Sequence, residues 1–287
     1  MRINDLVFVC GLLLTFALSC TNNSDKQADE KNSDSSSSID SADLAYLASD
    51  ECYIKFFHKL PKFTDSNSAF LEMGDGKKVS MTQFFKDEFM SPVSQYGTKD
   101  MDGDAVPELI IYNNTGGAHC CDEYYVFSRK GDNQYLFKAH LMGGGTCIDA
   151  GTNTFTFSFN ETFGYFFSCY ACEFKDSTNN FKTMREIYLK YINGRLQILP
   201  YDKAAEKQNL INLDILQKHG FEKVEGLMDN GWRKEFAMNF AVWHFNHGQK
   251  WDETRAIFNR YYQFRDAAKI WEEFYNTLND SRKENTF

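Results

Sequence analysis

Apolar residues recur at helical spacing in two parts of the chain. Near the start they predict one helix over Ala42–Leu60, which Pro61 ends. Ser80 and Gln83 form a capping-box pattern, so a second helix is predicted to begin at Ser80. Beyond Asp202 the helical spacing returns and predicts three further helices. These span Lys203–His219, Trp232–His247 and Trp251 to about Asn279.

The middle of the chain has the pattern of β-strands, with apolar and polar residues alternating over short segments. Asn193-Gly194 separates two such segments and strongly favours a two-residue hairpin. A further turn is predicted at Lys130 to Asn133. The predicted strands are Glu108–Tyr112, Glu123–Ser128, Gln134–Leu141, Thr152–Phe159, Gly164–Tyr170, Arg185–Ile192 and Arg195–Leu199. This order predicts an α+β fold, with an antiparallel twisted sheet in the middle, short N-terminal helices and a C-terminal helical segment.

The first 41 residues differ in composition from the rest of the chain. Residues 1–19 combine a positive start at Arg2 with the apolar stretch Leu6–Leu18, which is too short for a membrane span and indicates a signal peptide. Ser19 before Cys20 matches a lipobox, so we expect Cys20 to be acylated and to begin the mature protein. Residues 20–41 are rich in Ser, Asp, Asn and Lys, and this composition predicts a disordered tether.

These segments predict a lipoprotein of the bacterial cell envelope, anchored in the outer membrane and facing the periplasm or the exterior. The tether is expected to carry an α+β domain at residues 42–200 and a helical segment at 201–287 packed on it. The formal net charge is -9 and Lys and Arg do not cluster, so no nucleic-acid partner is expected. Aromatic residues make up 16% of the chain, and we expect most of them in the core and some at surfaces that stack against sugars.

Four carboxylates crowd into nine residues that precede an apolar stretch. Asp100, Asp102, Asp104 and Glu108 occupy positions 1, 3, 5 and 9 of this segment. Charges this close repel one another, and calcium, which accepts about six to eight oxygens, would relieve the repulsion. The carbonyl oxygen of Val106 is a further candidate ligand. The alternative is a solvated acidic turn between a helix and a strand.

The segment resembles a known calcium loop. Its pattern, Asp-x-Asp-Gly-Asp-x-x-Pro-Glu-Leu, is similar to the loop of FG-GAP repeats, found in integrin-alpha-type β-propeller blades and in bacterial VCBS-type repeat proteins. The family usually has glycine where this chain has Ala105. The chain has too few strands for a propeller of at least about four blades, so only the loop is carried over. The resemblance implies as calcium ligands the side chains of Asp100, Asp102, Asp104 and Glu108 and the main chain of Val106.

A longer segment, Asp100 to Phe127, resembles a group of exported bacterial proteins. They combine this loop with a Gly-Gly-Ala-His-Cys-Cys turn, which is Gly116–Cys121 here. The resemblance implies no particular activity.

The cysteines predict disulfides. The chain has eight cysteines, and in an oxidising compartment the even number left after the signal peptide and lipidation favours pairing. Adjacent Cys120 and Cys121 are expected to have separate partners, for which Cys147 and the Cys169/Cys172 pair are the natural candidates. The pairing itself is left open. The six candidates are Cys52, Cys120, Cys121, Cys147, Cys169 and Cys172.

No sequence motif argues for catalysis. The chain lacks a hydrolase elbow, a zinc-protease helix motif, a P-loop and a dinucleotide fingerprint. The sequence therefore favours a non-catalytic, calcium-stabilised binding or scaffold protein with a protein or glycan ligand, and no catalytic residue is assigned. Two alternatives stay open. One is a hydrolase of envelope or extracellular polymers, with Asp122 and Glu123 near the turn at His119. The other is a soft-metal or redox protein that uses His119 and cysteines such as Cys169 and Cys172.

Overall fold

The described strands form two sheets, and helices complete the fold. In this computed structural model the described residues are 69–86, 95–114, 122–143, 146–149, 152–177, 179–220 and 229–287. All of them belong to one unit, Ser41–Phe287. The predicted signal peptide, tether and first helix lie outside the described residues.

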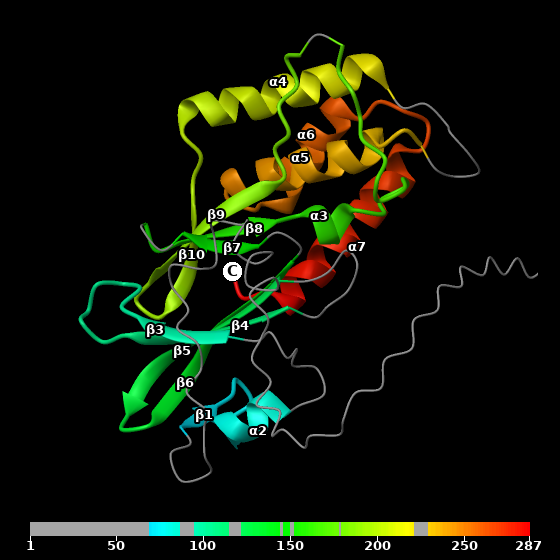
Figure 1. The fold of residues 1–287 in the computed structure, drawn as a ribbon. Helices are drawn as coiled ribbons and strands as arrows, with labels where there is room; N and C mark the ends of the chain where they lie inside the picture. The colour runs from blue at the N-terminus through cyan, green and yellow to red at the C-terminus, as the bar shows by residue number, and fades with distance from the viewer. Residues whose placement is uncertain are drawn as a thin grey trace, which may run out of the picture. The chain divides into compact units, whose positions relative to one another are not determined.

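The first sheet has six strands in the order β2-β1-β6-β5-β4-β3 (Figure 1). Neighbouring strands are antiparallel, except that β1 runs parallel to β6. Strand β4 is buried along almost its whole length, as expected of an inner strand that is covered on both faces. The strands are β1 (Phe70–Glu72), β2 (Lys78–Ser80), β3 (Gln95–Lys99), β4 (Glu108–Asn114), β5 (Asp122–Gly131) and β6 (Gln134–Gly143).

The second sheet has four antiparallel strands in the order β10-β9-β8-β7. The predicted hairpin is confirmed: Asn193 and Gly194 join β9 to β10 with φ of 51° and 76°, as a two-residue mirror-image turn requires. The strands are β7 (Cys147–Asp149), β8 (Thr154–Ser158), β9 (Glu186–Ile192) and β10 (Arg195–Leu199).

The α+β class is confirmed, but the single predicted sheet is two sheets. Strand β1 pairs with the edge of β6 that β5 leaves free. β1 covers that edge only at Gln134–Leu136, and Thr286 and Asn285 hydrogen-bond to His140 and Met142 farther along β6. Because the C-terminal residues take the end of β6 nearest to β7, β7 does not extend the first sheet and pairs with β8 instead. The short strands β1, β2, β3 and β7 were not predicted.

The predicted strand at Gly164–Tyr170 is wrong. A short helix, α3 (Asn160–Phe163), precedes an irregular segment in which Ser168 alone forms a bridge, to Asp229. Phe167 has a φ of 52°, which an extended strand does not allow. Phe163 and Phe166 are both buried, so the apolar residues here follow the spacing of a helical turn.

Five longer helical segments complete the described structure. Ser80 Oγ accepts a hydrogen bond from the Gln83 amide at 3.1 Å, which is the cap predicted for α2. Asp202 caps α4 by accepting from the amides of Ala204 and Ala205 at 2.9 and 2.8 Å. The predictions of α4 and α5 are confirmed. The helices are α2 (Met81–Lys86), α4 (Lys203–His219), α5 (Trp232–Asn246), α6 (Trp251–Tyr261) and α7 (Ala267–Glu284).

The last predicted helix is in fact two helices, α6 and α7. The buried stripe of α6 consists of Thr254, Phe258 and Tyr261. One more turn would place Arg265 on this stripe, in the core. The chain instead leaves the helix after Tyr261, and Arg265 is exposed.

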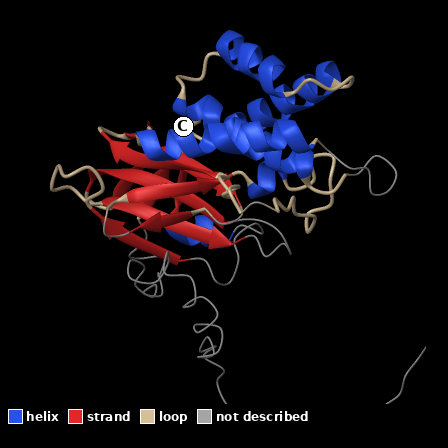
Figure 2. Ribbon diagram, turned by 90° about the horizontal axis from the view of Figure 1, so that it is seen from above, coloured by secondary structure: helices blue, strands red, loops and turns tan. Residues whose placement is uncertain are grey.

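Helices α4 to α7 gather on one side of the strands (Figure 2). Helix α5 is the central one, because all of its residues except Asn246 are buried. Along it, Trp232, Phe236 and Phe240 stack with ring centroids 5.4 and 5.6 Å apart. Among the described residues, no helix has both the length and the apolar character needed to cross a membrane.

Candidate metal site

The acidic segment forms the loop of a β-hairpin. It connects β3 to β4, and the flanking residues Lys99 and Glu108 pair directly across the two strands. The segment therefore lies between two strands, whereas the solvated-turn alternative placed it between a helix and a strand. Gly103 and Ala105 adopt left-handed conformations, with φ of 83° and 66°. Position 6 thus has the backbone conformation that glycine adopts most easily, and Ala105 accepts some strain there.

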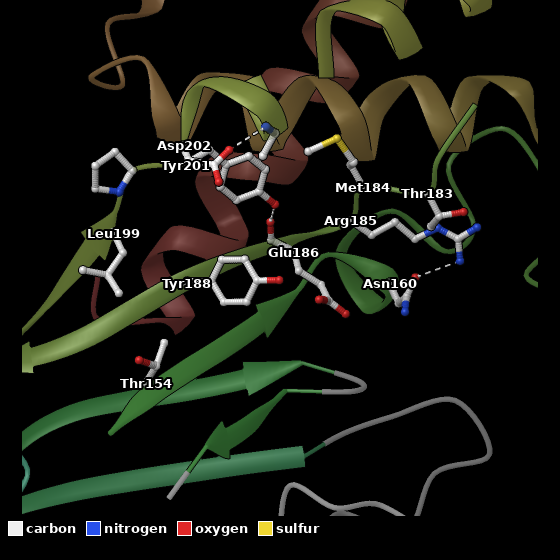
Figure 3. A pocket seen from close by; sticks show the side chains of 12 residues that line it. Thr154, Asn160, Thr183, Met184, Arg185, Glu186, Tyr188, Leu199, Tyr201 and Asp202 are labelled. Carbon is white, nitrogen blue, oxygen red and sulfur yellow. Dashed lines mark hydrogen bonds between the residues drawn. The ribbon is translucent and has the colours of Figure 1, made fainter. Parts of the chain in front are cut away.

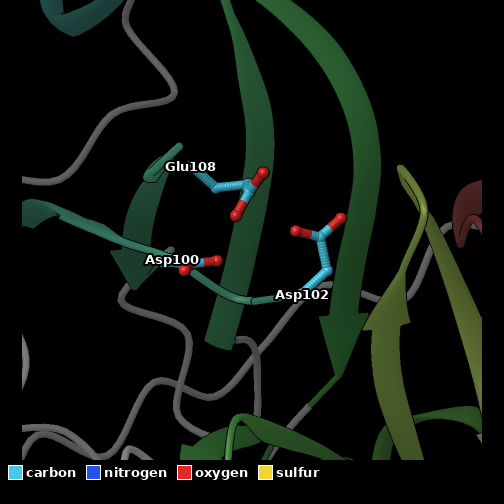
Figure 4. Close-up of side chains that lie close together, drawn as sticks. All are labelled: Asp100, Asp102 and Glu108. Carbon is cyan, nitrogen blue, oxygen red and sulfur yellow. The ribbon is translucent and has the colours of Figure 1, made fainter. Parts of the chain in front are cut away.

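Three of the predicted ligands come together. Carboxylate oxygens of Asp100, Asp102 and Glu108 all lie within 4.8 Å of one another. Figure 4 shows the carboxylates of Asp102 and Glu108 directed toward each other, with Asp100 beside them. Glu108 is only 3% exposed, so this cluster is sunk into the surface.

The loop holds these acids with its own amides. Asp100 accepts from the amides of Gly103 and Ala105 at 2.7 and 3.0 Å. Glu108 Oε2 accepts from the Met101 amide at 2.9 Å. Asp102 Oδ1 is buried and has no hydrogen-bond partner among the described residues. A buried carboxylate oxygen without a donor is costly, and a bound cation would satisfy it.

Two predicted ligands are not part of this cluster. Asp104 is exposed, and its carboxylate accepts from the Val106 amide at 2.7 Å. Val106 is 41% exposed. Their roles as calcium ligands stay predictions from the resemblance.

The electrostatics of the cluster reflect its crowding. Burial raises the pKa of the Glu108 carboxyl to about 7, and the Asp102 and Asp104 carboxylates add to the rise, against the hydrogen bond from Met101. Burial raises the pKa of the Tyr191 hydroxyl on β9, and the negative charges of Glu108, Asp102 and Asp104 raise it further. Every group in the cluster donates oxygen, so the donor set suits a hard dication such as calcium and not a thiophilic metal.

The loop is also fastened to the second sheet. Met101 is 1% exposed and belongs to the main apolar core. Asn153, just before β8, donates its side-chain amide to the carbonyl oxygens of Asp100 at 3.0 Å and Met101 at 3.4 Å. The sequence places Asn153 inside the predicted strand Thr152–Phe159 and does not single it out. In the structure it lies in a turn with a φ of 56°, a conformation that asparagine tolerates well.

The described cysteines are all oxidised. Cys169 is bonded to Cys172, and Cys147 is also disulfide-bonded. Cys169 and Cys172, named as natural partners for Cys120 and Cys121 while the pairing was left open, bond to each other instead, because their three-residue separation lets them close their own ring.

Cys20, Cys52, His119, Cys120 and Cys121 lie outside the described residues. Because all three described cysteines are in disulfides, none of them offers a free thiol to a soft metal.

Asp122 and Glu123, the acids named for the hydrolase alternative, lie at the start of β5. As consecutive residues of β5 they point to opposite faces of the sheet. Asp122 accepts from the Tyr112 hydroxyl at 2.8 Å. Burial opposes ionisation of Glu123, but hydrogen bonds from His140, Tyr125 and Asn113 outweigh it and hold the pKa of this carboxyl below its usual range. Both acids are engaged in holding the strands together.

Comparison of the chain with protein-family models, with curated proteins and with solved structures gives no match. The resemblance to FG-GAP calcium loops therefore stays a prediction, drawn from the residues of the loop.

Proposed function

We propose that this chain is a bacterial envelope lipoprotein whose folded part is a non-catalytic binding or scaffold protein stabilised by calcium. The observation that carries the calcium assignment is the cluster of Asp100, Asp102 and Glu108, with one buried carboxylate oxygen that lacks a partner. Calcium suits it better than magnesium, because calcium tolerates the irregular geometry of a loop and takes additional carbonyl and water oxygens.

In this proposal the ion has a structural role. The loop enters β4, inserts Met101 into the core and is held by Asn153 from the second sheet. Without the ion, the repulsion between three carboxylates lowers the stability of the folded state. A bound ion removes this repulsion and stabilises the folded loop that connects the two sheets. The rigid unit would then present a surface to a protein or glycan of the envelope.

Calcium is expected to raise the melting temperature of the purified chain after chelation. At about 100 times its dissociation constant, an ion bound only to the folded state adds about 2.7 kcal/mol, which is about 5–10 °C for a domain of this size. Asp102→Asn and Glu108→Gln should each abolish most of the shift in differential scanning calorimetry and the heat of calcium binding in titration calorimetry.

The matched control is Asp132→Asn, in the exposed turn between β5 and β6. It should keep the full calcium shift. If the unsubstituted chain shows neither heat nor a melting shift at millimolar calcium, the calcium site is wrong. An equal shift in the Asp102→Asn and Glu108→Gln variants would place calcium elsewhere.

The lipid anchor makes a separate prediction. Cys20→Ser should leave the chain in the soluble fraction of disrupted cells, because the acylated cysteine is the proposed link to the membrane. The unsubstituted chain should sediment with membranes and gain the mass of its acyl groups in intact-protein mass spectrometry. Cys10→Ser, inside the predicted signal peptide, is the control and should change neither result. An unacylated wild-type chain would contradict the anchor.

A further inference from the structure

A cavity of about 590 Å³ opens beside the second sheet, and no residue of the acidic loop lines it. Its volume lies within the range of small-molecule sites, about 300–1,000 Å³. It lies where β8, β9 and the start of α4 meet (Figure 3). The residues that matter for its chemistry are Thr154, Asn160, Arg185, Glu186, Tyr188 and Tyr201.

The alternation of β9 supplies one wall. Ile187 and Leu189 are fully buried in the core. Glu186 and Tyr188 therefore extend together from the other face of the strand, into the cavity (Figure 3). Thr154 enters from β8, the neighbouring strand. This wall is rigid, because both of its strands are fixed in a sheet and packed on the core.

Glu186 offers a hydrogen-bond acceptor that the chain itself does not use. Among the described residues no group donates a hydrogen bond to its carboxylate, whereas its backbone carbonyl accepts from the Tyr201 hydroxyl at 2.5 Å. Burial raises the pKa of this carboxyl, although the charge of Arg185 opposes the rise. A half-buried carboxyl in this position gains from a ligand that brings donors to it.

Donors and an aromatic face surround this acceptor. Arg185 donates to Asn160 Oδ1 at 3.4 Å and pairs with Glu235, which fixes both polar groups at the cavity. Tyr188 is 39% exposed, so its ring presents an apolar face with a hydroxyl at the edge. Donors, acceptors and an aromatic face within one cavity match the alternating hydroxyls and C–H faces of a sugar.

We propose that this cavity is a saccharide-binding site, in which Glu186 accepts hydrogen bonds from sugar hydroxyls, Asn160 and Thr154 hold further hydroxyls, and Tyr188 stacks on the sugar ring. The assignment rests on the proposed binding function and names its ligand class. Arg185 disfavours an ammonium ligand and Glu186 disfavours a phosphate, because each would place like charges close together.

The test uses the purified full-length chain, in a detergent without a sugar headgroup. Titration with cellobiose, maltose and di-N-acetylchitobiose, followed by saturation-transfer NMR, represents free sugars. Sedimentation with purified peptidoglycan represents a polymer, and titration with spermidine and inorganic phosphate represents the two charged ligand classes. Binding of at least one of the sugars or of peptidoglycan is expected. Glu186→Gln and Tyr188→Ala should each weaken it about tenfold, as loss of a charged hydrogen bond or of a stacking face implies.

Two matched controls lie outside the cavity. Glu253→Gln removes an exposed carboxylate and Tyr165→Ala an aromatic side chain that is 64% exposed, and both should leave binding unchanged. Circular dichroism spectra of all four variants should match that of the unsubstituted chain.

Three results would overturn the saccharide site. They are no binding to any of the sugars or to peptidoglycan, sugar binding that Glu186→Gln does not weaken, and a preference for spermidine or inorganic phosphate over every sugar. The calcium-dependent melting shift is measured on the same protein without sugar. Failure of the saccharide site is therefore distinguishable from failure of the calcium site.

Discussion

Arg185→Met is expected to lower the free energy of unfolding by about 3–5 kcal/mol, the usual cost of removing one partner of a buried ion pair. The Arg185 guanidinium pairs with Glu235 on α5, and its Nε donates to Glu235 Oε2 at 3.4 Å. The side chain of Glu235 is only 1% exposed. Without Arg185, this carboxylate would remain in the core with Lys234 as its only nearby positive group among those that shift its pKa.

The partner substitution, Glu235→Gln, should cost clearly less. Arg185 is 20% exposed, so it can turn toward water when its partner is lost, and glutamine keeps the shape and one acceptor. Combining Arg185→Met with Glu235→Gln should recover part of the loss caused by Arg185→Met alone, since no charge is then left buried. Urea unfolding at pH 7 measures all three.

The effect of Arg185→Met should also depend on pH. Burial raises the pKa of Glu235 above its usual value, and Arg185 opposes the rise. In the variant, the carboxyl takes up a proton in the folded state more readily than in the unfolded state, so its destabilising effect should shrink as pH falls toward 5. Arg195→Met, at an exposed position of β10, is the control. Equal losses for Arg185→Met and Arg195→Met would contradict the buried ion pair.

Local signals predicted the elements that depend on their own residues. The Asn193-Gly194 turn needs only two residues that tolerate positive φ, and the structure forms the hairpin as predicted. Helix α4 has the predicted limits, because its cap, Asp202, adjoins it in sequence and a buried stripe runs along one face. In each case the deciding interactions lie within a few residues of one another.

Elements that depend on distant partners were not predicted. Strand β1 is only three residues long and is stabilised by β6, more than 60 residues later. The break between α6 and α7 is held by distant contacts. Arg233 on α5 donates to the Tyr262 hydroxyl at 3.1 Å and to Asp266 at 2.5 Å. A pattern along the chain carries no information about such pairings.

The residues of the candidate metal site show the same difference between local and distant interactions. The acidic loop is contiguous, so its spacing was enough to predict that the carboxylates of Asp100, Asp102 and Glu108 would lie close together. Asn153, which holds the loop from the second sheet, is 52 or 53 residues away from its partners and was missed.

The cavity was missed for a different reason. Glu186 and Tyr188 alternate with buried residues, and that pattern is typical of any strand with one solvated face. The cavity forms only because the segment from Leu199 to Ala205, which leads from β10 into the start of α4, lines its other side.

His244 presents the clearest case of a titratable group enclosed by the core. It is fully buried on α5 and stacks on Trp251 with ring centroids 4.4 Å apart. The Thr254 hydroxyl donates to the Lys250 carbonyl, so toward His244 Nδ1, 2.7 Å away, it is the acceptor. His244 is therefore the tautomer with the proton on Nδ1. Its Nε2 is buried without a partner among the described residues, so a second proton would find no acceptor.

Acidification is expected to destabilise the chain through His244. Burial, and then the charge of Arg282, lowers the pKa of this imidazole to about 4. In the unfolded state this imidazole takes up a proton near pH 6.5, and in the folded state it does so only near pH 4. The free energy of unfolding is therefore unaffected by His244 above pH 6.5 and falls as the pH drops from 6.5 toward 4. A shift of this size corresponds to about 3 kcal/mol. His244→Phe keeps the stacked ring and removes the titration.

The measurement is the difference in the free energy of unfolding between His244→Phe and the unsubstituted chain, obtained by urea unfolding from pH 4.5 to 7.5. Glu108, Glu235 and the other titrating groups are common to both proteins, so they cancel in the difference and leave the part due to His244. The stability of His244→Phe relative to the unsubstituted chain should rise steadily as pH falls below 6.5. A difference independent of pH would mean that His244 accepts its proton in the folded state, and that water or a carboxylate reaches Nε2.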